Sequence, residues 1–319
     1  MRAAVCRSYG PPEAVKVEEF PAPALATGQV RVRVHAASVN YPDVLLVANT
    51  YQMSVPTPFV PGSEFAGVVE EVAAGVEELA PGDRVSGTGL VGAFAEEAVV
   101  AARAAYRLPS TVDLRTAAAF GVAHRTAYHA LRSFGRVEPG EDLVVLGAGG
   151  GVGLAAVQIG VLLGASVTAV ASSDEKLKVA ASYGARHLVN HREVKLREAL
   201  AGGADVVVDP VGGDLAEPAL RSLRWGGRFV TVGFASGTIP RLPLNLVLLK
   251  GVRVLGFQLR DFATKAAEEY RRNEEDLAGL LATGQVRPHI GAAFALDEVA
   301  AALRHVADGH AIGKVVIDV

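Results

Sequence analysis

The sequence predicts an α/β protein in which a doubly wound parallel sheet is joined to a mostly β domain of barrel type. Two observations predict the sheet. A glycine-rich turn lies between an apolar strand and an apolar helix at 143–164, and further strands alternate with helices as far as residue 257. A third observation predicts the β domain, because residues 1–118 contain short strands separated by Pro/Gly turns, with no helical crossovers.

The glycine-rich turn has the sequence GAGGGVG and occupies residues 147–153. A strand, a glycine turn and a helix form the context that a dinucleotide-binding motif requires, because glycines let the backbone approach a pyrophosphate at the helix N-terminus. The common G-x-G-x-x-G spacing is not met, since Val152 stands where the third glycine belongs. Gly147, Gly150 and Gly153 recur instead at three-residue spacing. A tight glycine turn without a ligand is the alternative interpretation.

The next predicted strand, 166–171, ends without the acid that binds the adenosine ribose in NAD-binding proteins. Ser172 and Ser173 occupy that place. Ser172 with Glu175 predicts a capping box, which puts Lys176 in the first helical turn, where the helix dipole disfavours a cation. An anion in front of the lysine explains this placement, and the 2′-phosphate of NADP is such an anion. An ordinary solvated lysine is the alternative.

Length, composition and charge exclude several classes of protein. The 319 residues allow two domains of ordinary size, and the 50% hydrophobic content supplies a large core. A net charge of −3 without a basic block argues against nucleic acid as a partner. The single Cys6 excludes an internal disulfide and a multi-cysteine zinc site. Neither a signal peptide nor a membrane span is predicted, so we expect a cytoplasmic protein.

The chain divides into three predicted segments. Residues 1–118 form the catalytic, barrel-like domain, and residues 119–257 form the cofactor-binding domain. The sequence pattern becomes helical from about residue 116, at the junction of the two. Residues 258–319 comprise a polar helix at about 262–282 and a strand–helix–strand tail. The tail is too short to fold alone, so we expect this last segment to return to the first domain and to leave the cofactor between the two domains.

Seven stretches of sequence carry a resemblance that covers nearly the whole chain: PGSEFAGVVEEVAAGV (61–76), PGDRV (81–85), GAGGGVGLAAVQI (147–159), ASYGARHLVNHRE (181–193), DPVGG (209–213), GGRFVTVGFASG (226–237) and LNLVLLKGVRVLGF (244–257). Together they resemble the medium-chain dehydrogenase/reductase superfamily, and within it the zinc-free quinone oxidoreductase and zeta-crystallin group. The resemblance implies a Rossmann domain, a GroES-like catalytic domain, and an NADPH-dependent reductase that transfers hydride to a quinone.

One departure from the superfamily concerns zinc. Its zinc-dependent alcohol dehydrogenases need a Cys and a His in the N-terminal domain, the His within a G-H-E motif. Here that motif is Gly62-Ser63-Glu64, Cys6 lies elsewhere, and the lobe with four structural-zinc cysteines is absent. We therefore expect no metal, and an acceptor that needs no Lewis acid, such as a quinone or a conjugated carbonyl. An enone or enoyl-thioester reductase is the alternative, and a structural or RNA-associated role of zeta-crystallin type is a third possibility.

The resemblance also implies site residues. Tyr51 and Asn40 are placed at the nicotinamide end of the cleft as hydrogen-bond donors, while Asp43 is expected to fix their turn rather than transfer protons. Lys314 is expected to reach the cofactor, and Thr126 is a weaker candidate. The other expected cofactor contacts are Ala148, Gly149, Gly150, Gly151, Val152 and Gly153 at the pyrophosphate, Ser172, Lys176 and His191 at the adenosine phosphate, and Val232, Gly233, Phe234, Ala235, Phe257, Gln258 and Leu259 at the nicotinamide.

Each of these side chains also has a plainer interpretation. Tyr51 is then a half-buried surface tyrosine, Asn40 a turn residue, His191 a loop histidine and Lys314 a solvated charge.

The last predicted strand of the sheet, 253–257, is apolar and promotes aggregation unless it is paired. In similar reductases this strand pairs with its two-fold mate, so we expect a homodimer or a multiple of one.

Overall fold

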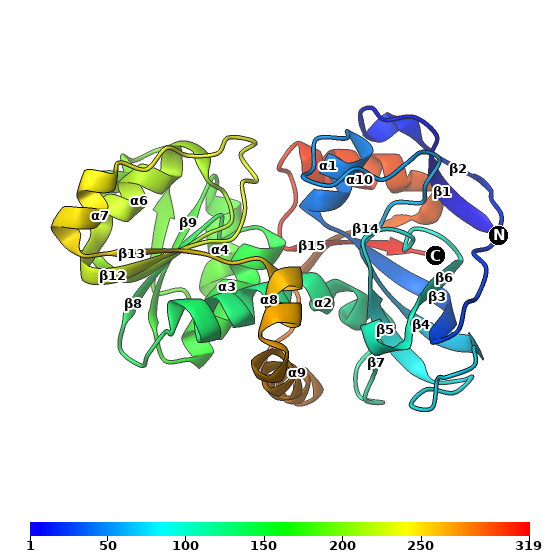
Figure 1. Cartoon of the computed structure of the whole chain (residues 1–319). Coiled ribbons are helices and arrows are strands. Elements are labelled where there is room, and N and C mark those ends of the chain that lie inside the picture. Colours follow the sequence, from blue (N-terminus) through cyan, green and yellow to red (C-terminus); the bar gives the residue numbers. More distant parts are fainter. The chain divides into compact units, whose positions relative to one another are not determined.

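The computed structural model describes all residues, Met1–Val319, and the chain folds into two compact units (Figure 1). The first unit comprises Met1–Val122 and Pro288–Val319, and the second comprises Ala123–Arg287. The return to the first unit therefore begins at Pro288, thirty residues later than the sequence analysis places it.

The reason for this later return is the predicted polar helix, which is two helices, α8 (Leu259–Lys265) and α9 (Ala267–Ala282). The buried Asn273 of α9 donates its amide N–H groups to His129 Nδ1 and Ser133 Oγ, both at 3.0 Å. Leu277 and Leu281 of the same helix are also buried. These contacts hold α9 on the second unit.

The first unit is built on a seven-stranded sheet with the order β14-β15-β3-β4-β5-β7, and β6 pairs with β3. The strands are β3 (Gln29–Val39), β4 (Glu64–Val72), β5 (Arg84–Thr88), β6 (Glu97–Ala101), β7 (Ala105–Arg107), β14 (Ile290–Ala295) and β15 (Lys314–Asp318). In β3 buried residues alternate with more exposed ones as far as residue 35, the pattern of a sheet with one face in the core. A separate antiparallel pair joins β1 (Arg2–Cys6) to β2 (Val15–Glu19).

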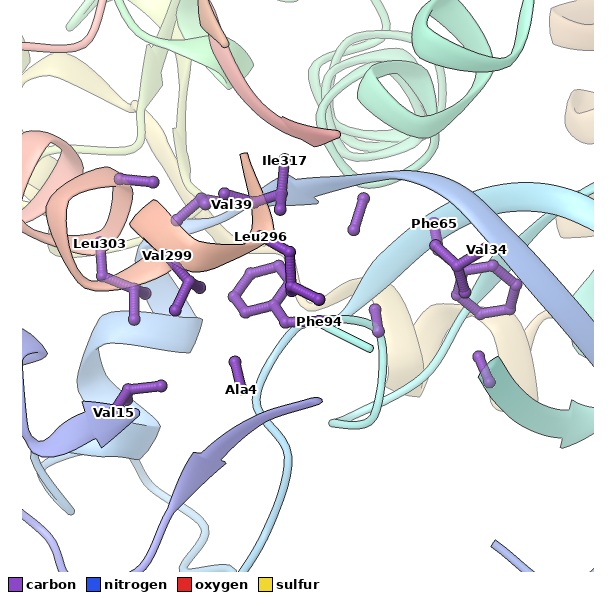
Figure 2. Packing of buried hydrophobic residues seen from close by; sticks show 14 of the residues in the cluster. Ala4, Val15, Val34, Val39, Phe65, Phe94, Leu296, Val299, Leu303 and Ile317 are labelled. Carbon is purple, nitrogen blue, oxygen red and sulfur yellow. The ribbon is translucent and has the colours of Figure 1, made fainter. Parts of the chain in front are cut away.

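Helices α1 (Tyr41–Val47) and α10 (Val299–Ala307) pack on each other in this unit, although they are far apart in the sequence (Figure 1). Figure 2 shows the core beneath α10, where Leu296, Val299 and Leu303 face Phe94 and Val39. Burial of each such side chain contributes about 1.5–3 kcal/mol to the free energy of unfolding. Short single-turn helices lie at Pro12–Ala14, Ala102–Ala104 and Leu296–Glu298.

The second unit holds a six-stranded parallel sheet with the order β10-β9-β8-β11-β12-β13. Its strands are β8 (Asp142–Leu146), β9 (Ser166–Ala171), β10 (His187–Asn190), β11 (Ala204–Asp209), β12 (Leu223–Thr231) and β13 (Arg253–Gly256). The strand order reverses between β8 and β11. In doubly wound sheets ligands bind outside the carboxyl ends of the strands at such a reversal.

Helices cover both faces of this parallel sheet. Helices α3 and α4 pack on β8, β9 and β10, and helices α6 and α7 pack on β11 and β12. Because right-handed crossovers run in opposite directions from β8 and from β11, the two groups of helices cover opposite faces. The bounds are α2 (Leu114–His129), α3 (Gly151–Leu162), α4 (Asp174–Ser182), α5 (Leu196–Ala199), α6 (Ala216–Ser222) and α7 (Leu244–Lys250), with a π-helical stretch at Ala130–Gly135 and a 3-10 turn at Gly213–Leu215. None of the helices combines the length and apolar character that a membrane-spanning helix needs.

The predicted capping box at Ser172 is wrong. Helix α4 begins at Asp174, and its N-cap is Ser173, whose Oγ accepts the Lys176 N–H at 3.4 Å. Ser173 keeps an extended backbone (φ −157°, ψ 154°), so the chain enters the helix one residue later than expected. Ser172, half-buried at the end of β9, is therefore not used as a cap.

Candidate functional site

The glycine turn of the second unit is closely packed backbone. Gly147 has φ 63°, a left-handed conformation that favours glycine. A Cβ on Gly153 would lie 2.0 Å from the Gly147 carbonyl oxygen, so the start of α3 rests directly on the turn. Gly150 is the N-cap of α3. The N–H groups of Gly151, Val152 and Gly153 have no acceptor within the helix, as in any first helical turn, and they form an anion-binding end.

Lys176 packs against this turn. A Cβ on Gly149 would lie 2.6 Å from both Cβ and Cγ of Lys176, so the lysine stem crosses over that glycine. Burial lowers the pKa of Lys176, and the nearby charge of Arg192 lowers it further, while Glu175 acts in the opposite direction. The sequence analysis placed the lysine and the turn at one cofactor, and the structure brings them into contact.

His191 and Arg192 complete a basic group with Lys176. His191 follows β10, and its N–H donates to the Ala171 carbonyl at the end of β9 at 3.1 Å. Burial lowers the pKa of His191, and the charges of Arg192 and Lys176 lower it further. The acidic neighbour Asp174 accepts a hydrogen bond from Asn190 at 3.1 Å. Like charges gathered in this way favour an anion as ligand.

Arg192 is the member of the basic group that the sequence analysis did not select. It lies in the stretch NHRE at 190–193, which carried the resemblance, but its role depends on the pairing of β10 with β9. This pairing sets Asn190 opposite Ala171 and so brings the residues that follow β10 to the end of β9. The sequence motif therefore indicates that the segment matters, but only the register of β9 and β10 shows that Arg192 lies at this group.

The predicted contacts at 232–235 lie at the carboxyl end of β12. Val232 and Gly233 donate their N–H groups to the Asp209 carbonyl at 2.8 and 3.3 Å. Two residues after Asp209, the Val211 side chain would lie 2.6 Å from a Cβ on Gly147, so this loop adjoins the glycine turn. Phe234 is 38% exposed beyond it. This stretch is therefore on the edge of the sheet that carries the turn.

Four other predicted contacts lie in the second unit. Phe257 is buried, with its ring centroid 5.0 Å from that of Phe134 and 6.0 Å from that of Phe262. Gln258 caps α8 by accepting the Asp261 N–H at 2.6 Å. Leu259 is the first residue of α8, and Thr126 is buried in α2. The Phe257 ring belongs to an aromatic cluster, so its direct role at a cofactor stays a prediction.

A second group of polar residues meets in the first unit because of strand register. In the sheet Ser38 of β3 pairs with Glu64 of β4, and Val39 pairs with Val315 of β15. The end of β3 and the starts of β4 and β15 therefore coincide. The residues brought together there are Asn40, Asp43, Ser63, Glu64 and Lys314, which we call the polar network.

A buried ion pair lies at the centre of the polar network. Lys314 Nζ lies 2.6 Å from Glu64 Oε1, and the two side chains are 4% and 1% exposed. Lys314 also donates to Asn40 Oδ1 at 2.5 Å and to the Val39 carbonyl at 3.4 Å. The other oxygen of Glu64 accepts the Val122 N–H at 2.7 Å. All three donors of the ammonium are engaged inside this unit, so the geometry does not support the expected cofactor contact of Lys314.

The Asn40 amide is likewise engaged. Its Nδ2 donates to Ser63 Oγ at 3.1 Å and to Glu64 Oε1 at 3.0 Å, while its Oδ1 accepts from Lys314. Both N–H donors are therefore used within the polar network, so the expected role of Asn40 as a donor to the acceptor molecule stays a prediction. The hydroxyl of Ser63 is half-buried and accepts from Asn40, which leaves its own O–H to donate.

Asp43 holds the start of α1, as the sequence analysis expected of it. Its Oδ2 accepts the Asn40 backbone N–H at 2.7 Å. Complete burial raises the pKa of Asp43 to about 7, against the lowering effects of the Asn40 N–H, the Ser63 hydroxyl and Lys314. The Asp43 Oδ1 atom has no hydrogen-bond partner.

Tyr51 lies in the loop after α1. The ring is half-buried and packs against the hydrophobic core of the first unit. Its hydroxyl makes no hydrogen bond to another protein group, so it stays available as a donor. Its role as a donor to the acceptor molecule stays a prediction.

No three His, Cys, Asp or Glu side chains gather in a way that could hold a metal ion. Ser63 and Glu64 are the residues of the polar network that sequence reasoning did not select. A signal was present, because Ser63 stands where the zinc enzymes have a ligand histidine. Only the register of β3, β4 and β15 reveals that these residues meet Lys314.

Comparisons with known proteins agree with this architecture. Residues 26–110 match the family model described as the alcohol dehydrogenase GroES-like domain, and residues 151–275 match the model described as zinc-binding dehydrogenase. The chain is therefore an oxidoreductase of the medium-chain dehydrogenase/reductase class, which confirms the predicted resemblance and fold class.

Comparison with individual relatives shows which family within this class the chain belongs to. Bovine quinone oxidoreductase-like protein 2 is 38% identical over 322 residues, which cover 99% of this chain and 92% of the relative. Human quinone oxidoreductase is 32% identical over 325 residues, covering 99% and 97%. The Escherichia coli quinone oxidoreductase complexed with NADPH is 27% identical, with a TM-score of 0.93 and full coverage of both chains. The chain belongs to the quinone oxidoreductase family.

Proposed function

We propose that this protein is a zinc-independent reductase that transfers hydride from NADPH to a quinone. The observation that carries the choice of cofactor is the basic group of Lys176, His191 and Arg192, next to Gly149 of the glycine turn. Lys176 and Arg192 repel each other electrostatically and disfavour the charged form of His191, and a phosphate bound among them relieves that repulsion.

The residues of the second unit suit both phosphate groups of NADPH, the pyrophosphate and the 2′-phosphate. The free N–H groups at the start of α3 suit the pyrophosphate, and the glycines leave space that a Cβ would fill. Ser172, Lys176 and Arg192 suit the 2′-phosphate, because hydroxyl and cationic donors replace the acid that binds a free ribose. When bound, NADPH supplies the hydride. The E. coli relative was crystallised with NADPH, which supports the same choice here.

The first unit supplies neutral donors for the acceptor molecule. A quinone that accepts hydride becomes an anion with its charge on oxygen, and a hydrogen-bond donor stabilises that charge as it develops. We propose that the hydroxyls of Tyr51 and Ser63 are these donors, and that Asn40 positions Ser63 through the 3.1 Å hydrogen bond.

Zinc independence rests on the donor set. Ser63 replaces the ligand histidine of the zinc enzymes, and the single Cys6 is buried in β1, where its thiol donates to the Ser8 carbonyl at 3.3 Å. A hydroxyl and an amide held by Lys314 are poor ligands for zinc, which prefers thiolate and imidazole. Elemental analysis should find less than one zinc per chain, and chelators should leave activity intact.

We also propose that the protein is a homodimer or a multiple of one. Strand β13 is an edge of the parallel sheet, and its Val254 is 41% exposed. Helix α7, which precedes β13, exposes Leu244 and Leu248 at 78% and 81%. An apolar edge and helix of this kind need a partner in solution. Light scattering at micromolar concentration should give at least twice the chain mass, and a monomer would contradict the proposal.

Substrate choice is tested by following NADPH oxidation against quinones, enones and enoyl thioesters side by side. We expect the quinones to be the fastest acceptors. Rapid turnover of an enoyl thioester with no quinone activity would support a reductase but show that a quinone is not its substrate. A filter-binding assay with RNA should show no retention, because the chain has no basic stripe.

The role of Tyr51 is tested by Tyr51→Phe, which removes only the hydroxyl. We expect kcat/KM for a quinone to fall by about tenfold or more, with little change in NADPH affinity. Tyr9→Phe is a matched control, because the Tyr9 hydroxyl bonds the Val55 carbonyl at 2.7 Å in the same unit. Full quinone activity in Tyr51→Phe would show that Tyr51 is not the donor.

A further inference from the structure

The Asp43 carboxyl is a buried acid, and only one of its two oxygens accepts a hydrogen bond. The side chain is 0% exposed, its Oδ2 accepts the Asn40 N–H at 2.7 Å, and its Oδ1 has no hydrogen-bond partner. A buried carboxyl with an open oxygen is costly when ionised, because no donor compensates the lost hydration. A structural cap needs only one oxygen, so the second is available for another task.

Ser63 connects this carboxyl to the outside of the network. Its hydroxyl is half-buried, whereas Asn40, Asp43 and Glu64 are all buried. The Ser63 hydroxyl accepts the Asn40 amide N–H at 3.1 Å, and it lies near enough to the Asp43 carboxyl to lower the pKa of that group. A hydroxyl has two acceptor positions and one donor. A protonated Asp43 can donate to the second acceptor position, which leaves the Ser63 O–H free to donate to a ligand.

We propose that Asp43 and Ser63 form a proton relay that protonates the oxygen of the reduced acceptor. The inference rests on the proposed function. The Ser63 O–H transfers its proton to the acceptor oxyanion, which forms one O–H bond and breaks another. Ser63 takes the Asp43 proton in the same event, so the serine is regenerated and Asp43 is left as a carboxylate. After the product leaves, a proton from water restores Asp43 through Ser63.

The charges around Asp43 suit this cycle. Glu64 and Lys314 are the charged groups that face it, and they form a neutral pair at 2.6 Å. Glu64 raises the pKa of Asp43 and Lys314 lowers it, while burial is the largest effect and brings the pKa to about 7. With this pKa the carboxyl is protonated in about half of the molecules in neutral solution, and it can both hold a proton and lose it during turnover. An acid whose pKa lies close to the working pH is suited to proton transfer.

The variants Ser63→Ala, Ser63→Thr and Asp43→Asn test the relay. For the intact protein we expect kcat/KM for a quinone to fall as the pH rises through about 7, because the protonated Asp43 is the donor. Asp43→Asn keeps an acceptor for the Asn40 N–H, so α1 can still form, but it should lower kcat/KM about tenfold or more at pH 6 and flatten the profile. Ser63→Ala should do the same, and Ser63→Thr should restore the activity and the pH dependence.

A direct titration supplies a readout that does not depend on turnover. Carboxyl carbon NMR of the free protein, assigned with Asp43→Asn, should show one aspartate titrating near 7. Ser63→Ala should move that titration upward, because the serine hydroxyl lowers the pKa of Asp43. The control Glu298→Gln removes an exposed carboxylate that accepts the Ala295 N–H at 3.0 Å, the same helix-start arrangement as Asp43. It should change neither the profile nor the NMR signal.

The outcomes separate the relay from the proposed function. An Asp43 that titrates near 4, or a Ser63→Ala enzyme with unchanged kcat/KM and pH profile, overturns the relay while quinone reduction stands. A protein that binds no NADPH, or ignores quinones, overturns the proposed function. The relay then survives only if Asp43 titrates near 7 and Ser63→Ala shifts that titration. In addition, kcat/KM for the acceptor found instead must fall as the pH rises through about 7.

Discussion

The glycine turn and the polar network are built in opposite ways. The turn is one continuous stretch of backbone at 147–153, and it works because side-chain atoms are absent from it. The network joins side chains that follow or begin three different strands, β3, β4 and β15, and it depends on every partner being present. A site made of backbone is specified locally, whereas a site made of side chains is specified by the register of the sheet.

The two regions also differ in what a single substitution does. The network contains the buried Lys314–Glu64 pair, and removal of one partner leaves an uncompensated charge. The turn contains no charge, so a substitution there acts only through added volume. We therefore expect larger losses of stability in the network and more selective losses of binding at the turn and its basic group.

The largest effect is expected for Lys314→Met. The substitution keeps most of the buried stem but leaves the Glu64 carboxylate without its partner, which should lower the free energy of unfolding by about 3–5 kcal/mol. Denaturant unfolding followed by circular dichroism measures this. The double variant Lys314→Met/Glu64→Gln should recover part of the loss, because no buried charge then remains unpaired.

The matched control is the exposed pair of Arg304 with Glu13, which meet at 2.7 Å in the same unit. Arg304→Met should leave the unfolding midpoint almost unchanged, because solvent screens exposed ion pairs. Equal losses in the two single variants would remove the contrast between buried and exposed charge that this comparison rests on.

The next effect is the pH dependence of stability that Asp43 contributes. Its pKa is raised from 3.8 in the unfolded chain to about 7 in the folded protein, so the folded state binds the extra proton between these values. The stabilisation is therefore complete below pH 4 and is lost as the pH rises through about 7. The loss should be on the order of 4 kcal/mol. Unfolding curves of the intact protein and of Asp43→Asn should diverge over this interval, and parallel curves would contradict a raised pKa.

The same contrast explains what could be predicted from the sequence. The glycine turn, the parallel sheet and the lysine beside the turn follow from local patterns, because strand, turn and helix are adjacent in the chain. Arg192 was missed since β10 must first pair with β9. The partners of Asn40 could not be predicted, because the positions of Glu64 and Lys314, 250 residues apart, are known only once both strands flank β3.

Within the glycine turn, Gly153→Ala and Gly150→Ala separate two kinds of crowding. A Cβ on Gly153 would lie 2.0 Å from the Gly147 carbonyl oxygen, so α3 must shift, at a cost of about 1–3 kcal/mol in stability. A Cβ on Gly150 has 3.6 Å to its nearest neighbour and should leave the melting temperature unchanged. NADPH affinity should fall at least tenfold in Gly153→Ala, because the helix N-terminus is displaced. Equal melting temperatures for the two variants would contradict the close packing of the turn.

The smallest and most selective effect is expected for Lys176→Met. Methionine keeps the apolar stem over Gly149 and removes the charge, so the turn itself should stay intact. A charge-assisted hydrogen bond to phosphate contributes roughly 1.5–3 kcal/mol, so the KM for NADPH should rise about tenfold or more while that for NADH hardly changes. Lys178→Met is the matched control, because Lys178 is an exposed lysine on the same helix. A similar loss in both variants would show that the effect comes from the general charge of α4. Equal use of NADPH and NADH by the intact protein would show that this site does not bind the 2′-phosphate.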